Sequence, residues 1–377
     1  MKKAKFVMEP KILIHHTKDR SLIGGATIEI RENEIWYIPT WGGRPVNFNP
    51  EGEAVFSDPK TGNALTVVKS FDGGFTWGEH EYLPASWDVD GVRNGGGLSI
   101  LRLHSRKLIM IAHRCSKKLW ASGDHGIPAI SFSSDEGVTW TPLRVMHHEE
   151  NEIYVMNQRL IQLESGRLIL PVAIRGVDVT HEEYQESISP NAARCYISDD
   201  EGISWRLSDV VTQDTLRGAD EPCVAEIGKN KVMMLFRGGK GSHQICYSED
   251  GGESWSKPQS TTLIAACSPL TLTTLPDGRL FIVYNHGEPS HKEAYYPRNP
   301  ICYATSTNEG KTWSEPVLIE DIPYRQLIYP SIIPLKSAIL VTYSEHLDEI
   351  GWKLLLDEAN ISNTQYGGKT CLVEYPD

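Results

Sequence analysis

One eight-residue turn sequence occurs five times in this chain of 377 residues, and this repetition constrains the fold more than any other feature. The copies begin at residues 70, 133, 198, 248 and 306 and share the form S-x-D/N-x-G-x-S/T-W, here called the Asp box. Neighbouring copies are 50 to 65 residues apart. A repeat of this length is typical of stacked or radial folds, in which each unit buries its apolar face against its neighbours.

Each Asp box is predicted to form the turn of a β-hairpin. Apolar strand-like stretches precede the boxes, such as ALTVVKS before the first and HQICYS before the fourth, and another short strand follows. The acidic or amide side chain accepts backbone hydrogen bonds within the turn, a glycine takes the positive φ, and the tryptophan packs over the hairpin. We therefore expect a structural role, not a calcium site, for Asp72, Asp135, Asp200, Asp250 and Asn308.

The repeat predicts an all-β fold, a six-bladed β-propeller with Asp-box hairpins. A second strand pair precedes the boxes, as in LTLTTLPDGRLFIVY, which gives four strands per unit. Five units carry a box, and LIYPSIIPLKSAILVTYSE after Trp313 supplies strands for a sixth. We expect residues 1–377 to form a single domain in which the N-terminal KFVMEPKILIHH closes the last blade, because an unpaired sheet edge promotes aggregation.

Charge and composition limit the partners and cofactors. The net charge of −12 argues against nucleic acid or an anionic membrane as the main partner, and no apolar run approaches the ~18 residues of a membrane helix. Glu9 and Pro10 interrupt any signal-like region, so we expect a cytoplasmic protein, or a secreted or periplasmic one if a leader has been removed. Seven cysteines without a CxxC pair, and histidines without HExxH, predict buried free thiols and no catalytic metal. No nucleotide-binding motif is present, so we expect no cofactor.

The boxes and the stretches between them resemble the sialidases (neuraminidases), the superfamily of BNR or Asp-box repeat propellers. The resemblance covers roughly residues 15 to 350. Besides the boxes it rests on QRLIQLESGRLILPVAI, DEPCVAEIGKNKVMMLFRGG, RNPICYATSTNEGKTW and IYPSIIPL. It implies an exo-acting glycoside hydrolase that cleaves terminal sialic (nonulosonic) acid from glycans with retention of configuration.

The resemblance implies that three arginines bind the carboxylate of the sugar. Arg237 ends KVMMLFR and Arg298 begins RNPICYATS, where two of the family's arginines are expected. Arg20 is the best match for the third, although this chain has R-S-L where the family usually has R-I-P. A guanidinium is planar, permanently charged and bidentate toward carboxylate, so three of them would form a strong anion site in an acidic protein.

The same resemblance assigns the catalytic groups. Tyr329 in IYPSIIPL matches the tyrosine nucleophile, and Glu221 in DEPCVAE matches the glutamate that takes its proton. A neutral phenol approaches a carbon that already bears a carboxylate more easily than a second anion does. The family's general acid is an aspartate of the first blade. This chain has Asn63 at the strand start, so we expect Asp58 in the preceding loop to be the acid, with Arg44 beside it.

Two alternative functions stay open at this point. The propeller could act on another acidic sugar, as a uronate lyase or hydrolase, or it could bind an acidic glycan without catalysis. The departures from the family pattern at Arg20 and at the general acid favour the first alternative over the second. Four further residues of the first two blades are expected to be structural more than functional: Trp41, Arg93, His113 and Arg114.

Overall fold

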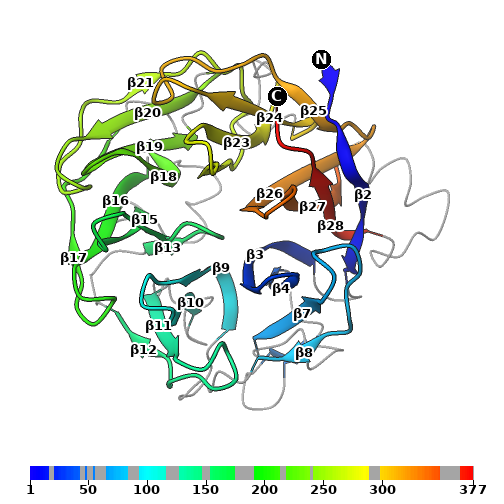
Figure 1. Ribbon diagram of the computed structural model, residues 1–377, viewed down its shortest axis with the longest axis horizontal. Helices are drawn as coiled ribbons and strands as arrows, with labels where there is room; N and C mark the ends of the chain where they lie inside the picture. Colours follow the sequence, from blue (N-terminus) through cyan, green and yellow to red (C-terminus); the bar gives the residue numbers. More distant parts are fainter. Residues whose placement is uncertain are drawn as a thin grey trace.

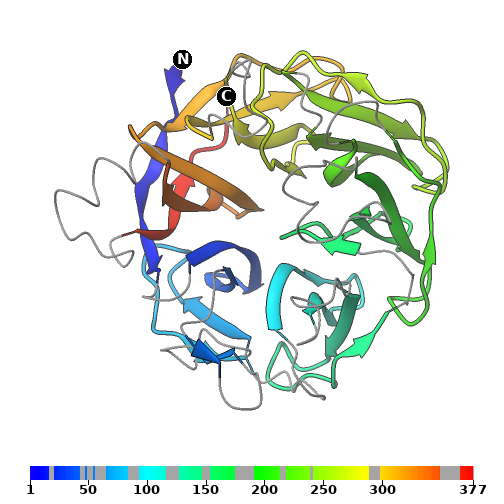
Figure 2. The same cartoon turned by 180° about the vertical axis from the view of Figure 1, so that it is seen from behind.

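The computed structural model is a six-bladed β-propeller, as the sequence predicts. Six sheets of four or five strands surround a common axis (Figure 1), and the view from behind shows the same ring (Figure 2). The structure describes residues 1–16, 21–42, 47–48, 54–55, 65–83, 93–115, 127–146, 153–174, 191–212, 218–237, 241–287, 298–348 and 366–376. This part of the chain contains no helix, and hence none long and apolar enough to cross a membrane.

The first three blades follow one another along the chain, and each begins with its innermost strand. The first blade consists of β3 (Ser21–Arg31), β4 (Glu34–Gly42), β7 (Thr66–Ser70) and β8 (Glu81–Tyr82). The second consists of β9 (Arg93–Arg102), β10 (Leu108–Cys115), β11 (Ile127–Ser133) and β12 (Arg144–Val145). In the third, β13 (Ile153–Val155) and β14 (Ile161–Gln162) both pair with β15 (Leu168–Ile174), which is followed by β16 (Ala192–Ser198) and β17 (Arg206–Leu207). A separate pair is formed by β5 (Asn47–Phe48) and β6 (Ala54–Val55).

The remaining blades include both ends of the chain. The fourth consists of β18 (Asp220–Gly228), β19 (Lys231–Arg237), β20 (His243–Ser248) and β21 (Gln259–Ser260). The fifth consists of β22 (Thr271–Thr274), β23 (Leu280–Asn285), β24 (Ile301–Ser306), β25 (Val317–Glu320) and β1 (Lys2–Lys3). The sixth consists of β26 (Arg325–Pro334), β27 (Ile339–Leu347), β28 (Gly367–Val373) and β2 (Phe6–His15). The N-terminal strands therefore complete two neighbouring blades, and the two termini lie on the same side of the ring (Figure 1).

The hydrophobic core consists of seams between neighbouring blades. In β10, Leu108 and Met110 face the first blade, whereas Ile109 and Ile111 face the third. Successive side chains of a strand point to opposite faces, so a strand between two blades needs an apolar residue at every position. This explains the continuous apolar runs in the sequence. Each fully buried aliphatic side chain stabilises the fold by about 1.5–3 kcal/mol.

The five Asp boxes form the same turn between the third and fourth strands of blades one to five. In the first box, the hydroxyl of Ser70 accepts from the Gly74 amide at 2.9 Å, and Asp72 Oδ1 accepts from the Thr76 amide at 2.8 Å. Equivalent bonds occur in the other four boxes, with Asn308 in place of the aspartate in the fifth. These bonds satisfy backbone donors that the turn would otherwise leave unpaired.

A glycine of each box packs on the preceding blade, which ties neighbouring blades together. A Cβ at Gly202 in the third blade would lie 2.8 Å from Ile109 Cδ1 in the second. A Cβ at Gly137 in the second blade would overlap the ring of Trp36 in the first. Both glycines also have a φ of 86°. Glycine is therefore required here by the close approach of the two blades as well as by the turn.

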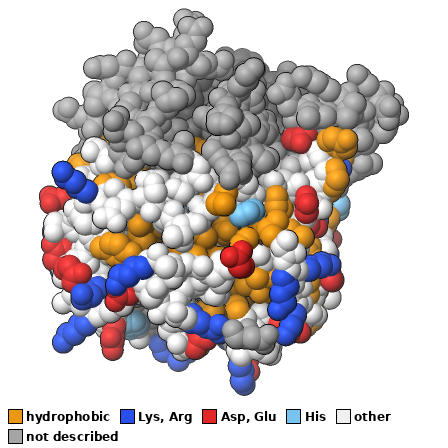
Figure 3. All heavy atoms as spheres, turned by 90° about the horizontal axis from the view of Figure 1, so that it is seen from above, with side chains coloured by type: hydrophobic (Ala, Val, Ile, Leu, Met, Phe, Trp, Pro, Cys, Tyr) orange, Lys and Arg blue, Asp and Glu red, His pale blue; other side chains and the backbone are white. Residues whose placement is uncertain are grey.

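Acidic and basic side chains are interspersed on the described rim of the ring (Figure 3). Arg167, for example, lies 2.7 Å from Asp199 in its own blade and 3.2 Å from Glu253 in the next. Exposed ion pairs of this kind contribute about 0–1 kcal/mol each, so the rim depends mainly on the apolar seams and the box turns. The described cysteines form no disulfide and are buried: Cys195, Cys223, Cys246, Cys267, Cys302 and Cys371.

Candidate active site

Tyr329 and Glu221 face each other across the axis of the propeller. Tyr329 lies on β26 of the sixth blade and Glu221 on β18 of the fourth, both innermost strands. The phenol hydroxyl lies 3.5 Å from Glu221 Oε1, a long hydrogen bond. Such a distance is common for catalytic groups without a bound substrate. The geometry thus brings together two residues that are 108 positions apart in the sequence.

Both residues lie at β-bulges in strained backbone. The pairing of β18 with β19 shifts register between Asp220 and Cys223, and that of β26 with β27 shifts between Ile328 and Ser331. Glu221 has a φ of 49° and Tyr329 a φ of 52°, in the left-handed region that bulky residues rarely adopt. Bulges re-aim side chains, and strained backbone of this kind is concentrated at functional sites.

Arg237 is held beside Glu221 by a second carboxylate. Its Nε and Nη2 donate to Asp220 Oδ2 at 2.9 and 2.7 Å, and all three side chains are buried. Arg237 Nη1 lies 3.1 Å from Glu221 Oε2, but neither atom makes a hydrogen bond with a described residue. Asp220 thus fixes one edge of the guanidinium, and Nη1 has hydrogen-bonding capacity left for a ligand.

Arg298 acts on the same pair from the fifth blade. Its side chain is buried, and its backbone oxygen accepts from the Leu327 amide of β26 at 2.8 Å. Its positive charge lowers the pKa of Glu221 and of Tyr329, as the charge of Arg237 does. Two guanidinium groups from different blades therefore act on one tyrosine–glutamate pair, Arg237 through an ion pair with Glu221 and Arg298 through its charge.

Burial sets the protonation states of the pair. It raises the pKa of Tyr329 to about 12, aided by the negative charge of Glu221 and opposed by Arg298 and Arg237. Burial and the neighbouring Asp220 charge also raise the pKa of Glu221, against the nearby arginines. Tyr329 is thus a neutral phenol near pH 7, next to a carboxylate that is more basic than a solvated glutamate.

The charges around this pair favour an anionic ligand. Among the described residues, the strongest charges on it come from Arg237, Arg298, Arg159 and Asp220. Three guanidinium groups thus accompany the carboxylates of Asp220 and Glu221. His243, paired with Arg237 across β19 and β20, adds no charge, because burial and the Arg237 charge lower its pKa to about 3. A buried excess of positive charge is unfavourable until an anion binds.

The structure brings four of the predicted site residues together: Tyr329, Glu221, Arg237 and Arg298. The predictions for Arg20, Arg44 and Asp58 lie outside the described residues. Trp41 is fully buried, with its ring centroid 5.8 Å from that of His80, which is a structural position. Strands β9 and β10 contain three further candidates whose side chains are not described: Arg93, His113 and Arg114.

Two residues of the site were missed in the sequence. Asp220 directly precedes Glu221 and pairs with Arg237 in the sheet register, so a predicted register would have revealed it. Arg159 follows a Gln158 with a φ of 54°, in the break between β13 and β14. Nothing in the sequence around it, NQRLIQ, indicates that its side chain crosses to another blade.

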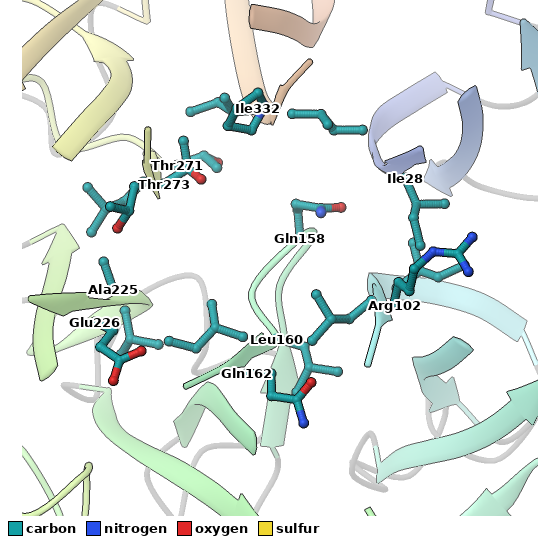
Figure 4. A pocket seen from close by; sticks show the side chains of 18 of the residues that line it. Ile28, Arg102, Gln158, Leu160, Gln162, Ala225, Glu226, Thr271, Thr273 and Ile332 are labelled. Carbon is teal, nitrogen blue, oxygen red and sulfur yellow. The ribbon is translucent and has the colours of Figure 1, made fainter. Parts of the chain in front are cut away.

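A cavity of about 640 Å³ lies at the ends of the inner strands that are far from Tyr329 and Glu221. Figure 4 shows Thr271, Thr273, Ala225 and Ile332 around it, with Gln158 near the centre. Glu221 and Tyr329 lie in the first half of their strands, whereas Ala225 and Ile332 lie further along the same strands. This cavity is therefore separate from the site of the tyrosine–glutamate pair.

The described residues hold no group of three or more His, Cys, Asp or Glu side chains that could bind a metal ion. The described side chains of the site supply a neutral phenol next to a carboxylate, and guanidinium groups that can bind an anion.

In comparison with known proteins, residues 100–341 match the family of the BNR repeat-like domain. The solved structure of a protein of unknown function from Dyadobacter fermentans has a TM-score of 0.70 at 18% identity. The match covers 100% of both chains. A Hadza microbial sialidase has a TM-score of 0.68 at 16% identity, over 95% of this chain and 66% of that one.

Two further matches extend these comparisons. The NanB sialidase of Streptococcus pneumoniae has a TM-score of 0.63 at 14% identity, over 97% of this chain and 70% of its own. Among curated proteins, a vacuolar protein sorting/targeting protein 10 of Aspergillus terreus is 22% identical over 232 residues. That match spans 59% of this chain and only 14% of the fungal protein. At these identities the structural similarities concern the fold alone.

Proposed function

This chain belongs to the family of BNR repeat-like domains and has the fold of the sialidases, and from this premise we propose that it is an exo-acting retaining sialidase. Its substrate would be a glycan that ends in a sialic or related nonulosonic acid. One observation carries the proposal: Tyr329 and Glu221 face each other in strained backbone, with Arg237 and Arg298 beside them. A tyrosine nucleophile is the known exception to the two-carboxylate scheme of glycosidases.

Substrate binding begins with the carboxylate at C1 of the sugar. Arg237 Nη1, which makes no hydrogen bond with a described residue, and the guanidinium of Arg298 receive this anion. Arg20 completes the set as the sequence predicts. Charge-assisted hydrogen bonds from planar guanidinium groups orient the sugar, so that C2 lies above the phenol of Tyr329.

In the first chemical step the phenol oxygen of Tyr329 forms a bond to C2, and its proton passes to Glu221. The bond from C2 to the leaving oxygen breaks, and Asp58 donates a proton to that oxygen. The raised pKa of Glu221 suits this role, since a more basic carboxylate takes the phenol proton at lower cost. The intermediate is an aryl glycoside, in which the sugar is bonded to the phenol oxygen of Tyr329.

In the second step water attacks C2 and the bond to Tyr329 breaks. Asp58 now accepts a proton from the water, and Glu221 returns its proton to the phenolate. Two displacements at the same carbon retain the configuration of the sugar. Because the nucleophile is neutral before attack, it approaches the anionic substrate without charge repulsion.

The test is hydrolysis of a fluorogenic sialoside, followed by trapping with a sialosyl fluoride that carries fluorine at C3. We expect fluorescence release and a covalent adduct that peptide mass mapping places on Tyr329. In the Tyr329→Phe variant the adduct should be absent. An adduct on another residue, or turnover that survives this substitution, would contradict the proposed nucleophile.

The same assays separate the two alternatives. A uronate lyase would leave sialosides intact and produce the ultraviolet absorbance of an unsaturated uronate from polyuronates. A glycan-binding propeller would bind a sialoside in calorimetry without releasing the sugar. Either result would refute hydrolysis of sialosides as the function.

A further inference from the structure

A third buried arginine, Arg159, lies between the blades beneath the tyrosine–glutamate pair. Its side chain extends from the third blade to the fifth, where Nη1 donates to Thr271 Oγ1 at 2.9 Å and Nη2 to the Leu270 carbonyl at 2.5 Å. The residue is 3% exposed, and no described carboxylate lies within ion-pair distance of it. Burying a guanidinium that meets no described carboxylate is costly, so its place in the fold calls for a functional explanation.

The backbone around Arg159 is fixed by the second blade. The Gln158 amide donates to the Leu98 carbonyl at 3.0 Å, and the Arg159 amide to Ser99 Oγ at 2.7 Å. Gln158 has a φ of 54°, which interrupts the inner strand of the third blade between β13 and β14. This break directs the Arg159 side chain across the ring to Leu270 and Thr271.

The hydrogen bonds of Arg159 continue to the nucleophile's own backbone. Thr271 Oγ1 accepts from Arg159 and donates to the Pro330 carbonyl, directly after Tyr329. Next along the bulge, Ser331 Oγ is hydrogen-bonded to Thr27 Oγ1 of the first blade. Side chains from three other blades thus support the segment that holds Tyr329 at its positive φ.

The charge of Arg159 also acts on the reacting pair. Its guanidinium interacts electrostatically with Cys223, with Glu221 and with Tyr329. When Tyr329 gives its proton to Glu221, the negative charge of the pair moves from the carboxylate to the phenolate. A fixed positive charge beneath both groups stabilises the negative charge on whichever of them carries it, and needs no reorganisation during this transfer.

We propose that Arg159 is a positioning residue for the tyrosine nucleophile: through Thr271 it holds the Tyr329 bulge, and its fixed charge stabilises the negative charge that the tyrosine–glutamate pair carries before and after proton transfer. The proposal rests on the proposed function for its catalytic meaning. Among the described residues, the other charged groups that act most strongly on Tyr329 are Asp220 and Glu221 from β18, Arg237 from β19, and Arg298. They are unchanged in the variants below, so a difference between variants reports on Arg159 alone.

The first measurement does not depend on turnover. Tyr329 is replaced by 3-fluorotyrosine, whose phenol ionises at lower pH, and its absorbance is titrated in chains with Arg159, Arg159→Met and Arg159→Lys. We expect Arg159→Met to raise the midpoint by about one unit or more, the effect of losing one charge at short range in a protein. Arg159→Lys should keep the midpoint within a few tenths of a unit. A folded Arg159→Met chain with an unshifted midpoint would overturn the electrostatic part of the proposal.

The second measurement is kinetic and uses Thr271→Val. This substitution keeps the shape of the side chain and removes the hydroxyl that links Arg159 to the Pro330 carbonyl. We expect kcat for the fluorogenic sialoside to fall about tenfold with little change in KM, since the hydrogen bonds of Thr271 position the nucleophile and do not bind the substrate. An unchanged kcat in Thr271→Val would overturn the positioning role. This test remains available if the Arg159→Met chain does not fold. If the wild-type chain hydrolyses no sialoside, the proposed function fails, while the fluorotyrosine shift still decides whether Arg159 acts on Tyr329.

Discussion

The rim and the hub of this propeller use opposite strategies. The rim, meaning the five Asp boxes, repeats one set of hydrogen bonds: the serine hydroxyl accepts from the glycine amide at 2.8–3.0 Å in each box. The hub, meaning the inner-strand residues around Tyr329, repeats its backbone but not its side chains. In both β18 and β26 a bulge sets two residues against one, and the first residue of each bulge, Glu221 or Tyr329, has a positive φ. Uniform side chains accompany stability at the rim, whereas different side chains on one kind of bulge accompany the proposed chemistry at the hub.

The largest effect should come from the hub. Tyr329→Phe removes only the hydroxyl that faces Glu221, so we expect kcat on a sialoside to fall about 10³-fold or more while the melting temperature stays the same. The matched rim variant is Tyr247→Phe, whose hydroxyl donates to the Glu309 carbonyl at 3.1 Å in the next blade. Its kcat should be unchanged. If both variants lost activity equally, the distinction between rim and hub would be wrong for function.

The next effect should come from the rim and affects stability instead of activity. Gly137→Ala places a Cβ where the Trp36 ring now lies, at a φ of 86°, and should lower the free energy of unfolding by about 3 kcal/mol. Gly278→Ala is the control, because its φ is 85° but no atom lies within 4 Å of the new Cβ. It should cost about 1 kcal/mol from the backbone alone. Denaturant unfolding of the two variants measures the difference, and equal losses would show that the box does not tie the blades together.

The same contrast explains what could be predicted from sequence. The Asp boxes repeat, so their turns, the blade number and the all-β architecture follow from local patterns and strand chemistry. In the hub, the roles predicted for Tyr329, Glu221, Arg237 and Arg298 come from the family resemblance and not from periodicity. Nothing in the chain's own pattern marks them.

The parts that were missed have a physical reason. Strands buried on both faces have continuous apolar runs, which carry no alternation and so no register. The bulge at Tyr329 and the pairing of Asp220 with Arg237 depend on register and were therefore not predictable. Arg159 was missed because its proposed role depends on a contact with Thr271, 112 residues away.

A pH profile sharpens the description of the hub. Burial raises the pKa of Glu221 above its ordinary value of 4.5, and the residue must be ionised to accept the proton of Tyr329. Activity is therefore present above the raised pKa and lost as pH falls through it, about tenfold per unit. The substrate is a sialoside whose leaving group is acidic enough to depart without protonation. With it we expect the loss of kcat/KM at low pH to have its midpoint above pH 4.5. A midpoint below that ordinary value, or a loss at low pH that persists in Glu221→Gln, would contradict Glu221 as the base.

The smallest effect should be the replacement of a single box carboxylate, for which the protein contains its own control. Asp250 Oδ1 accepts from the amides of Glu253 and Ser254, each at 3.0 Å, and Asn308 Oδ1 accepts from the Thr312 amide at 3.0 Å in the same turn. An amide oxygen thus serves as well as a carboxylate. Asp250→Asn should leave stability nearly unchanged at pH 7, whereas Asp250→Ala should cost about 1 kcal/mol, a modest loss because water competes at this exposed turn.

The pH dependence of stability provides the check on this last variant. Burial is the largest single influence on Asp250 and raises its pKa, but the hydrogen bonds from Ser254, Ser248 and the Glu253 amide together outweigh it and lower the pKa to about 2. A depressed folded-state pKa contributes stability above the unfolded pKa near 3.8, and this contribution disappears as pH falls toward 2. The difference in melting temperature between wild type and Asp250→Asn should therefore change only within that window. A difference that stayed constant down to about pH 2 would mean that the carboxylate charge plays no part, and that the box depends only on the geometry of its acceptor oxygen.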